Sequence, residues 1–444
     1  MPFRLITLLS RASVLLCLLH CMSLFAVPPG KGAVATSGPD AEVKEFRLDE
    51  LEATLRTMNP GSERDYFAGV LANRAGRTKD SIRLLNDALP KIRESQAARA
   101  AVALEALADD YNKNFRYDDA ARTYDDLLTH FAGHLGSKQL QGTKDDAGVM
   151  RLLQGAPAQT ITWKGRTRLK IEHNVLGSAV TELTVNGIQE KWLLDTGANL
   201  SVVSRSFARR LGLKPLPGFG QTMAGITGIE NPLQVAVLPM LEMGGATLHN
   251  VVVLVLDDSN LKIEIGKQVY QINAIVGYPV FQALGAISFQ RDGWFEAGDA
   301  IRHSATSTRM YMKLLMPVIE CEVEGKDLPF SFDTGASGTN LSIRYFERYR
   351  KEAGSWKKAE NKSYGAGGVK RRAIYLQPKL DLTVGDRTAT LKHVPIFTTK
   401  MGSDIDELYG NLGQDMVSAF DNFTLDFSKM TFSLGTPVTT QNRH

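Results

Sequence analysis

The spacing of hydrophobic residues changes once along the chain, at about residue 160. Between residues 45 and 135, hydrophobic residues recur at steps of three and four, which is the period of an amphipathic helix. From about residue 160 to Gly435, hydrophobic and polar residues alternate in short runs separated by glycine-rich turns. This alternation is typical of β-strands. The pattern therefore predicts a helical domain at 45–140, followed by a mostly β module.

The helical region contains two similar segments. Thr78–Ile82 aligns with Tyr117–Ala121 at a constant offset. Two helical hairpins of this kind resemble tetratricopeptide repeats, although the period is longer than is usual for that family. A plain helical bundle that packs on the next domain explains the pattern equally well. Both interpretations predict an interaction surface, with a possible protein partner, and no chemistry.

A hydrophobic run near the N-terminus predicts export. The run Ala12–Val27 follows Arg4 and Arg11, and its length suits a signal-peptide core better than a membrane span. We therefore expect a signal peptide at 1–27, a linker at 28–44 and a periplasmic or secreted protein. An uncleaved N-terminal anchor is the alternative. No later segment is long and hydrophobic enough to span a membrane.

Composition excludes several other classes of function. The chain has 444 residues with 43% hydrophobic and 23% charged residues, as in ordinary globular proteins, and a net charge of +4 that is too small to predict nucleic-acid binding. Cys17 and Cys21 lie in the N-terminal hydrophobic run, so its removal leaves Cys321 as the only thiol and permits no intrachain disulfide. The histidines show no ligand spacing, so we expect no metal and no cofactor.

The β module contains one acidic motif twice. The residues Asp-Thr-Gly-Ala end a hydrophobic run at 195–198 and end another at 333–336. One copy alone is explained by ordinary turn chemistry. However, Gly187 and Gly325 each precede the acid by the same number of positions, so a turn and a strand of equal length lead to both copies. The shared context predicts an internal duplication.

Glycine-rich segments follow at equivalent places in the two copies. They begin at nearly the same distance after the acid, and contain Gly225 and Gly228 in the first copy and Gly365 and Gly368 in the second. Both segments are expected to be hairpin turns, either ordinary ones or flaps that close over a ligand.

The duplication predicts two lobes, at 160–300 and 311–437, joined by a linker at 301–310. A pseudo-two-fold axis between the lobes would bring Asp195 and Asp333 together. Two adjacent carboxylates repel each other, so the two carboxyl groups would share a proton instead of both being ionised. A pair of this kind can activate a water molecule for acid–base hydrolysis of an amide.

From about residue 165 to 437 the chain resembles the aspartic proteases of the retropepsin and pepsin kind. The alanine after Asp-Thr-Gly and the phrase NLGQDMVSAF are more similar to retroviral and bacterial retropepsin-like members, here with both lobes on one chain. The resemblance implies two tandem acid-protease β-barrel lobes related by pseudo-two-fold symmetry, preceded by the helical domain. It implies Asp195 and Asp333 as the catalytic pair, acting on a peptide or protein substrate.

The resemblance also implies roles for the residues around the acids. Thr196 and Thr334 would cross-bond beneath the pair, and Gly197 and Gly335 would let the backbone approach the carboxyl groups closely. The supporting apolar-apolar-Gly element matches at 275–277 as Ile-Val-Gly. In the second copy it reads Asn-Leu-Gly at 411–413, so one apolar position is polar and regular packing of that lobe is in question.

We therefore predict an exported aspartic endopeptidase that is active as a monomer through pairing of its own two lobes. Because Ala198 and Ala336 lack the hydroxyl that could favour a charged carboxylate, we expect a pH optimum from weakly acidic to near neutral. The alternative function is a non-catalytic peptide-binding or scaffold protein that uses the duplicated fold and the helical domain. Pairing of lobes from different chains is a third possibility.

Overall fold

The computed structural model describes most of the chain from Gly38 onward. The described residues are 38–218, 220–224, 229–265, 268–301, 306–365, 368–400 and 404–438. The predicted signal peptide at 1–27 lies outside them, as do Gly225 and Gly228. Among the described residues, none of the helices has the length and hydrophobicity needed to cross a membrane.

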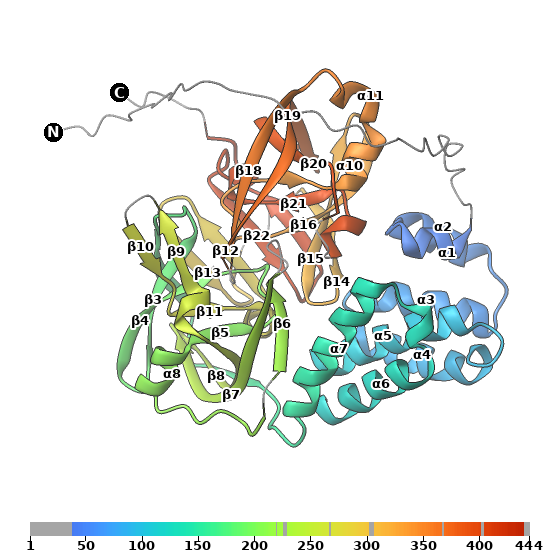
Figure 1. The fold of residues 1–444 in the computed structure, drawn as a ribbon, viewed down its shortest axis with the longest axis horizontal. Coiled ribbons are helices and arrows are strands. Elements are labelled where there is room, and N and C mark those ends of the chain that lie inside the picture. The colour runs from blue at the N-terminus through green and yellow to red at the C-terminus, as the bar shows by residue number, and fades with distance from the viewer. Residues whose placement is uncertain are drawn as a thin grey trace, which may run out of the picture. The chain divides into compact units, whose positions relative to one another are not determined.

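The first part of the described chain is helical (Figure 1, blue to teal). Its helices are α1 (Pro39–Lys44), α2 (Leu48–Thr57), α3 (Ser62–Arg74), α4 (Thr78–Ile92), α5 (Ala97–Lys113), α6 (Tyr117–His130), the 3₁₀-helix η1 (Ala132–His134) and α7 (Ser137–Leu152). The helical region therefore begins inside the predicted linker, and it continues past its predicted end at residue 140 as far as Leu152. Helix α1 is short and polar, so it has no hydrophobic period to detect.

Two helical hairpins repeat at the expected offset. The turns between α3 and α4 and between α5 and α6 each contain a left-handed residue, Gly76 with φ 69° and Phe115 with φ 56°, and these occupy equivalent positions in the two hairpins. The following N–H groups, those of Arg77 and Arg116, each donate at 2.8 Å to the carbonyl five residues earlier, which is a common way to end a helix. The resemblance to tetratricopeptide repeats itself remains a prediction.

Short strands and a few short helices form the rest of the described chain (Figure 1, green to red). The first lobe contains β1 (Thr160–Trp163), β2 (Thr167–His173), β3 (Ala179–Val185), β4 (Ile188–Leu194), β5 (Ser201–Ser204), α8 (Arg205–Arg210), β6 (Gly220–Ala224), β7 (Ile229–Met243), β8 (Ala246–Leu256), η3 (Asp258–Leu261), β9 (Lys262–Ile265), β10 (Gln268–Gln271), β11 (Ala274–Val276), α9 (Tyr278–Leu284), β12 (Ala286–Gln290) and β13 (Trp294–Ala297).

The second lobe contains β14 (Ser307–Lys313), β15 (Met316–Val323), β16 (Lys326–Phe332), β17 (Asn340–Leu341), α10 (Ile343–Arg348), α11 (Arg350–Ala353), β18 (Lys357–Gly365), β19 (Gly368–Val384), β20 (Arg387–Phe397), η4 (Asp404–Glu407), β21 (Gly410–Leu412), α12 (Gln414–Val417), β22 (Asn422–Asp426) and β23 (Thr431–Leu434). Strand β14 begins within the predicted linker at 301–310, because its first residues pair with β23.

The two lobes have the same strand pairings in the same order. Strand β4 pairs in parallel with β11, and β16 pairs in parallel with β21. Likewise, β5 pairs in parallel with β8, and β17 with β20. Strands β6, β7 and β8 form an antiparallel meander, as do β18, β19 and β20. The fold is mostly β and duplicated, as the sequence predicted.

The lobes of one chain are joined by a shared antiparallel sheet. Its order in the described residues is β2-β13-β12-β22-β23-β14. At its centre β12 pairs with β22, and the rings of Phe289 and Phe423 stack with centroids 4.8 Å apart. This pairing buries aromatic surface between the lobes and places them on either side of a pseudo-two-fold axis.

The turn before each acidic strand has the same conformation. Asn186 and Gly187, between β3 and β4, have φ of 51° and 76°, and Glu324 and Gly325, between β15 and β16, have φ of 51° and 74°. Two consecutive left-handed residues form a two-residue hairpin turn of the kind that fixes register. The hairpin predicted from Asn186-Gly187 is therefore present, and the second lobe repeats it with Glu324 in a strained position.

The helical region contacts both lobes. On the first lobe, the Gln282 side chain of α9 donates to the carbonyl of Lys113 at 3.4 Å. On the second lobe, the Arg309 guanidinium lies 3.1 Å from the Asp49 carboxylate and 2.6 Å from that of Glu52. Contacts to both lobes agree with the interpretation of this region as a bundle that packs on its neighbours.

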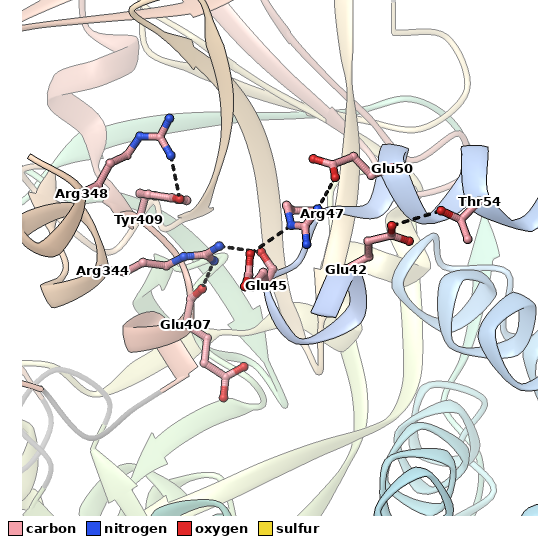
Figure 2. A network of polar contacts seen from close by, with 9 residues as sticks. All are labelled: Glu42, Glu45, Arg47, Glu50, Thr54, Arg344, Arg348, Glu407 and Tyr409. Atoms are coloured by element: carbon pink, nitrogen blue, oxygen red, sulfur yellow. Dashed lines mark hydrogen bonds and ion pairs between the residues drawn. The ribbon is translucent and has the colours of Figure 1, made fainter. Parts of the chain in front are cut away.

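A polar network extends the contact with the second lobe (Figure 2). Arg344 on α10 donates to the backbone carbonyl of Glu45, between α1 and α2, at 2.9 Å, and to that of Glu407 on η4. Arg47 forms ion pairs with Glu45 and Glu50 beside it. Hydrogen bonds from a guanidinium to backbone carbonyls fix this end of the helical region against α10.

Candidate active site

Asp195 and Asp333 each follow a strand whose last residues are buried. Asp195 follows β4 and its N–H donates to the carbonyl of Val276 on β11 at 3.1 Å, while the N–H of Asp333 donates to Leu412 on β21 at 3.0 Å. The parallel neighbouring strand thus continues the hydrogen bonding by one residue in both lobes. Both aspartates are partly buried, and the last three residues of each strand that leads to them are buried.

Each carboxyl group is held by its own loop. Asp195 Oδ1 accepts from the N–H groups two and three residues later, at 2.9 and 3.1 Å. Asp333 Oδ1 accepts from the equivalent groups at 2.7 and 3.1 Å. Backbone donors to one oxygen leave the second oxygen of each carboxyl group available for other partners.

Two threonines link the lobes beneath the acids. The Thr196 N–H donates to Thr334 Oγ1 at 3.0 Å, and the Thr334 N–H donates to Thr196 Oγ1 at 3.1 Å. Each hydroxyl then donates across the interface, to the carbonyl of Phe332 at 3.3 Å and of Leu194 at 2.8 Å. Both threonines are buried, and the structure places them in the cross-bonded arrangement that the resemblance implies.

The glycines of the motifs allow the two acids to meet. A Cβ atom added at Gly197 would lie 2.5 Å from the carboxyl carbon of Asp333, and one added at Gly335 would lie 2.5 Å from that of Asp195. Any side chain at either position would occupy the space of the opposite carboxyl group. The contacts are reciprocal, so each carboxyl group lies against the glycine of the other lobe.

The two acids interact electrostatically. Burial of the Asp195 carboxyl group raises its pKa well above the ordinary value, and the charge of Asp333 and hydrogen bonding to it raise the pKa further. The backbone donors from 197 and 198 act in the opposite direction but do not cancel these effects. The pair therefore keeps a proton at pH values where an isolated aspartate is ionised.

An antiparallel pair of strands leads to each predicted flap segment. Strands β6 and β7 pair up to Ala224 and Ile229, and Gly225 and Gly228 lie outside the described residues. Strands β18 and β19 pair up to Gly365 and Gly368 themselves. Antiparallel hairpins therefore stand at equivalent places in both lobes, as expected from the glycine spacing.

Asn411 has a role that sequence reasoning missed. From the sequence it is only a polar interruption in the packing of the second lobe. In the structure its side chain is 3% exposed and contacts both Ser331 and Asp333 through its amide group. The signal that could have found it is Ser331, which is polar where the first copy has Leu193.

No group of three or more histidine, cysteine, aspartate or glutamate side chains is arranged to hold a metal ion among the described residues. The thiol of Cys321 is buried, and burial raises its pKa, so it is not arranged as a nucleophile. The titratable groups that the two motifs bring together in the described site are the carboxyl groups of Asp195 and Asp333.

Comparison with known proteins supports the class of the first lobe. Residues 181–280, which include the first acidic motif, match the family described as aspartyl protease. The match covers less than a quarter of the chain and includes neither the helical region nor the second lobe. At the level of class, the first lobe is similar to the aspartyl proteases.

Similarities outside that family are distant. No curated protein matches the sequence. Among solved structures, basic 7S globulin from soybean is 11% identical with a TM-score of 0.38, and the similarity covers 63% of this chain and 95% of the globulin. Conglutin gamma, a basic 7S globulin from lupine seeds, is 11% identical with a TM-score of 0.40 and the same coverage.

Proposed function

We propose that the protein is an aspartic endopeptidase that hydrolyses peptide bonds with the Asp195–Asp333 pair. The observation that carries the proposal is the reciprocal holding of the two acids, each against the glycine of the other lobe's motif. Bringing two like charges together costs desolvation and repulsion. A cleft that only binds peptides does not need two adjacent carboxyl groups, whereas acid–base catalysis by such a pair does.

The proposed reaction uses a water molecule between the two carboxyl groups. The ionised carboxylate takes a proton from the water as the water oxygen bonds to the carbonyl carbon. The protonated acid gives its proton to the carbonyl oxygen, which completes a tetrahedral diol. In the second step, the newly protonated acid gives its proton to the amide nitrogen and the C–N bond breaks. The other carboxylate takes a hydroxyl proton of the diol, so a carboxylic acid and an amine leave and the pair again holds one proton.

The two hairpins act as flaps in this proposal. The β6–β7 and β18–β19 hairpins are antiparallel and stand at equivalent places in the two lobes. An extended peptide can pair its backbone with such strands, as in other cases of strand addition. Closure of the hairpins over the peptide would exclude bulk water from the acids.

The proposal extends to the oligomeric state and the localisation of the protein. Because both acids lie on one chain whose lobes pair with each other, we propose a monomer as the active form. The N-terminal hydrophobic run supports export to the periplasm or outside the cell. The helical region would then position the protease relative to a protein partner, because its two repeated hairpins are expected to form an interaction surface.

Peptide cleavage by the purified protein tests the proposal. The protein is incubated with a diverse peptide library, with and without an inhibitor that mimics the transition state of aspartic proteases, and products are identified by mass spectrometry. We expect internal cleavage that the inhibitor suppresses, because the inhibitor occupies the position of the attacking water. Cleavage that the inhibitor leaves unchanged would contradict the Asp195–Asp333 mechanism, and binding of peptides without cleavage would favour the non-catalytic alternative.

A further inference from the structure

The two acids have different surroundings at one pair of positions. In the first lobe, Leu193 on β4 pairs with Ile275 on β11. In the second lobe, the equivalent strands β16 and β21 pair Ser331 with Asn411. All four side chains are buried. An apolar pair behind Asp195 is thus replaced by a polar pair behind Asp333.

Ser331 orients the Asn411 amide. Its hydroxyl donates to Asn411 Oδ1 at 2.6 Å, so the amide oxygen faces the serine and the NH₂ group faces the other side. There Asn411 Nδ2 donates to Asp333 Oδ2 at 3.4 Å. This is the oxygen that the backbone donors of the acid's own loop leave available.

The acids therefore differ in their hydrogen-bond donors. Asp333 accepts from two backbone N–H groups and from the Asn411 amide. Asp195 accepts from the two equivalent backbone groups, and Ile275, which occupies the position of Asn411, has no donor. A donor to a carboxylate stabilises its charged form, and a buried donor does so more strongly than an exposed one.

We propose that Asn411, oriented by Ser331, is a positioning residue that keeps Asp333 as the ionised member of the pair and leaves the shared proton on Asp195. The inference rests on the proposed function and assigns its two chemical roles. Asp333 is the base that takes a proton from the attacking water, and Asp195 is the acid that protonates the carbonyl oxygen. The first step of the reaction then has one direction instead of two equivalent ones.

The neighbouring groups agree with this assignment. Burial and the charge of Asp333 raise the pKa of Asp195, as expected for the member that keeps the proton. On α12, Asp415 accepts from the N–H of Thr339 at 2.9 Å and from its hydroxyl at 2.7 Å, so its carboxylate is hydrogen-bonded to the loop that follows Asp333. Gln414 is neutral and donates to the carbonyl of Thr334 at 2.6 Å.

Replacing Asn411 with isoleucine tests the inference. The side chain then matches Ile275 of the first lobe and has no donor, so ionisation of Asp333 becomes less favourable. We expect the lower of the pair's two apparent pKa values, read from the acid limb of kcat/KM against pH, to rise by about one, which is about tenfold in the ionisation constant. A limb that superimposes on that of the wild type would overturn the inference.

A double variant tests the same inference if the Asn411→Ile variant folds poorly. Ser331→Leu with Asn411→Ile copies the complete apolar pair of the first lobe, which packs in the same register there. It should show the same rise in the lower pKa with a melting temperature close to that of the wild type. If the folded double variant has the same acid limb of kcat/KM against pH as the wild type, the proposed role of the Asn411 amide is contradicted.

A second readout separates this inference from the proposed function. The carboxyl carbons of Asp195 and Asp333 are followed by ¹³C NMR against pH, with Asp195→Asn and Asp333→Asn variants for assignment. We expect Asp333 to ionise first in the wild type and the order to weaken or reverse in the Asn411→Ile variant. If Asp333 ionises first but the protein cleaves no peptide, the role of Asn411 is supported and the proposed function is contradicted. If the protein cleaves peptides but the order of ionisation is the same in wild type and Asn411→Ile, the proposed function is supported and the role of Asn411 is contradicted.

Discussion

Replacement of Asp195 by asparagine should lower the rate of peptide cleavage by about 10³-fold or more. Asparagine keeps the shape and can still accept from the backbone donors at 197 and 198. It cannot give a proton to the carbonyl oxygen or take one back, so both chemical steps lose their partner. Binding of a substrate peptide should be retained, because the proposed backbone pairing with the two hairpins does not involve Asp195.

The same variant should be more stable than the wild type at neutral pH. The pKa of Asp195 is raised in the folded protein. The contribution of Asp195 to stability is therefore fully present below the pKa that it has in the unfolded chain. This contribution is lost as pH rises through the pKa that it has in the folded protein. Asparagine removes this loss, so the difference in melting temperature between variant and wild type should grow as the pH rises from weakly acidic to neutral.

Asp299→Asn is the matched control for both effects. Asp299 is exposed in the segment that follows β13. Its replacement should change neither the cleavage rate nor the pH dependence of the melting temperature. Equal turnover by Asp195→Asn and wild type would contradict the catalytic assignment, and equal melting temperatures at every pH would contradict the raised pKa.

Replacement of Gly335 by alanine should damage both the activity and the fold. The new Cβ would lie 2.5 Å from the Asp195 carboxyl carbon and 2.5 and 2.7 Å from its two oxygens. The carboxyl group cannot simply rotate away, because its own loop holds it by two backbone bonds. We expect about a 10²-fold loss in kcat/KM from misplacement of the acid, and about 1–3 kcal/mol of destabilisation from overpacking.

Gly338→Ala provides the control three residues further along the same loop. A Cβ at Gly338 would meet only Asp415 Oδ2, at an ordinary 3.8 Å. Kinetics and thermal unfolding of both variants, measured together, should show a large effect at 335 and a small one at 338. Similar small effects at the two positions would mean that the carboxyl groups do not approach the opposite glycines as closely as the structure has them.

The sequence is informative about the fold wherever its signals are local. The Asn186-Gly187 turn, the run that ends at Asp195 and the second copy at Asp333 are continuous stretches, so their strands and their equivalence could be predicted. The reciprocal approach of the acids follows from the duplication, because a two-fold axis brings equivalent residues together. The predicted boundaries of the helical region are less accurate, since α1 has little hydrophobic period.

What could not be predicted depends on residues far apart in the sequence. The contact of Asn411 with Ser331 joins distant parts of the chain and exists only because β16 and β21 pair in parallel in one register. Read alone, Asn411 is a polar residue at an apolar position. The contacts between the helical region and both lobes, such as that of Arg309 with Asp49, have no sequence signature because surface charges pair in many ways.

The dependence of kcat/KM on pH, for cleavage of a peptide from the library, is the sharpest test of proton sharing between Asp195 and Asp333. A pair that shares one proton is active only in its singly protonated state, so we expect a bell-shaped profile. The maximum should lie between weakly acidic and near-neutral pH, since the pKa of Asp195 is raised. A maximum below about pH 3, or the absence of cleavage at every pH, would contradict catalysis by the Asp195–Asp333 pair.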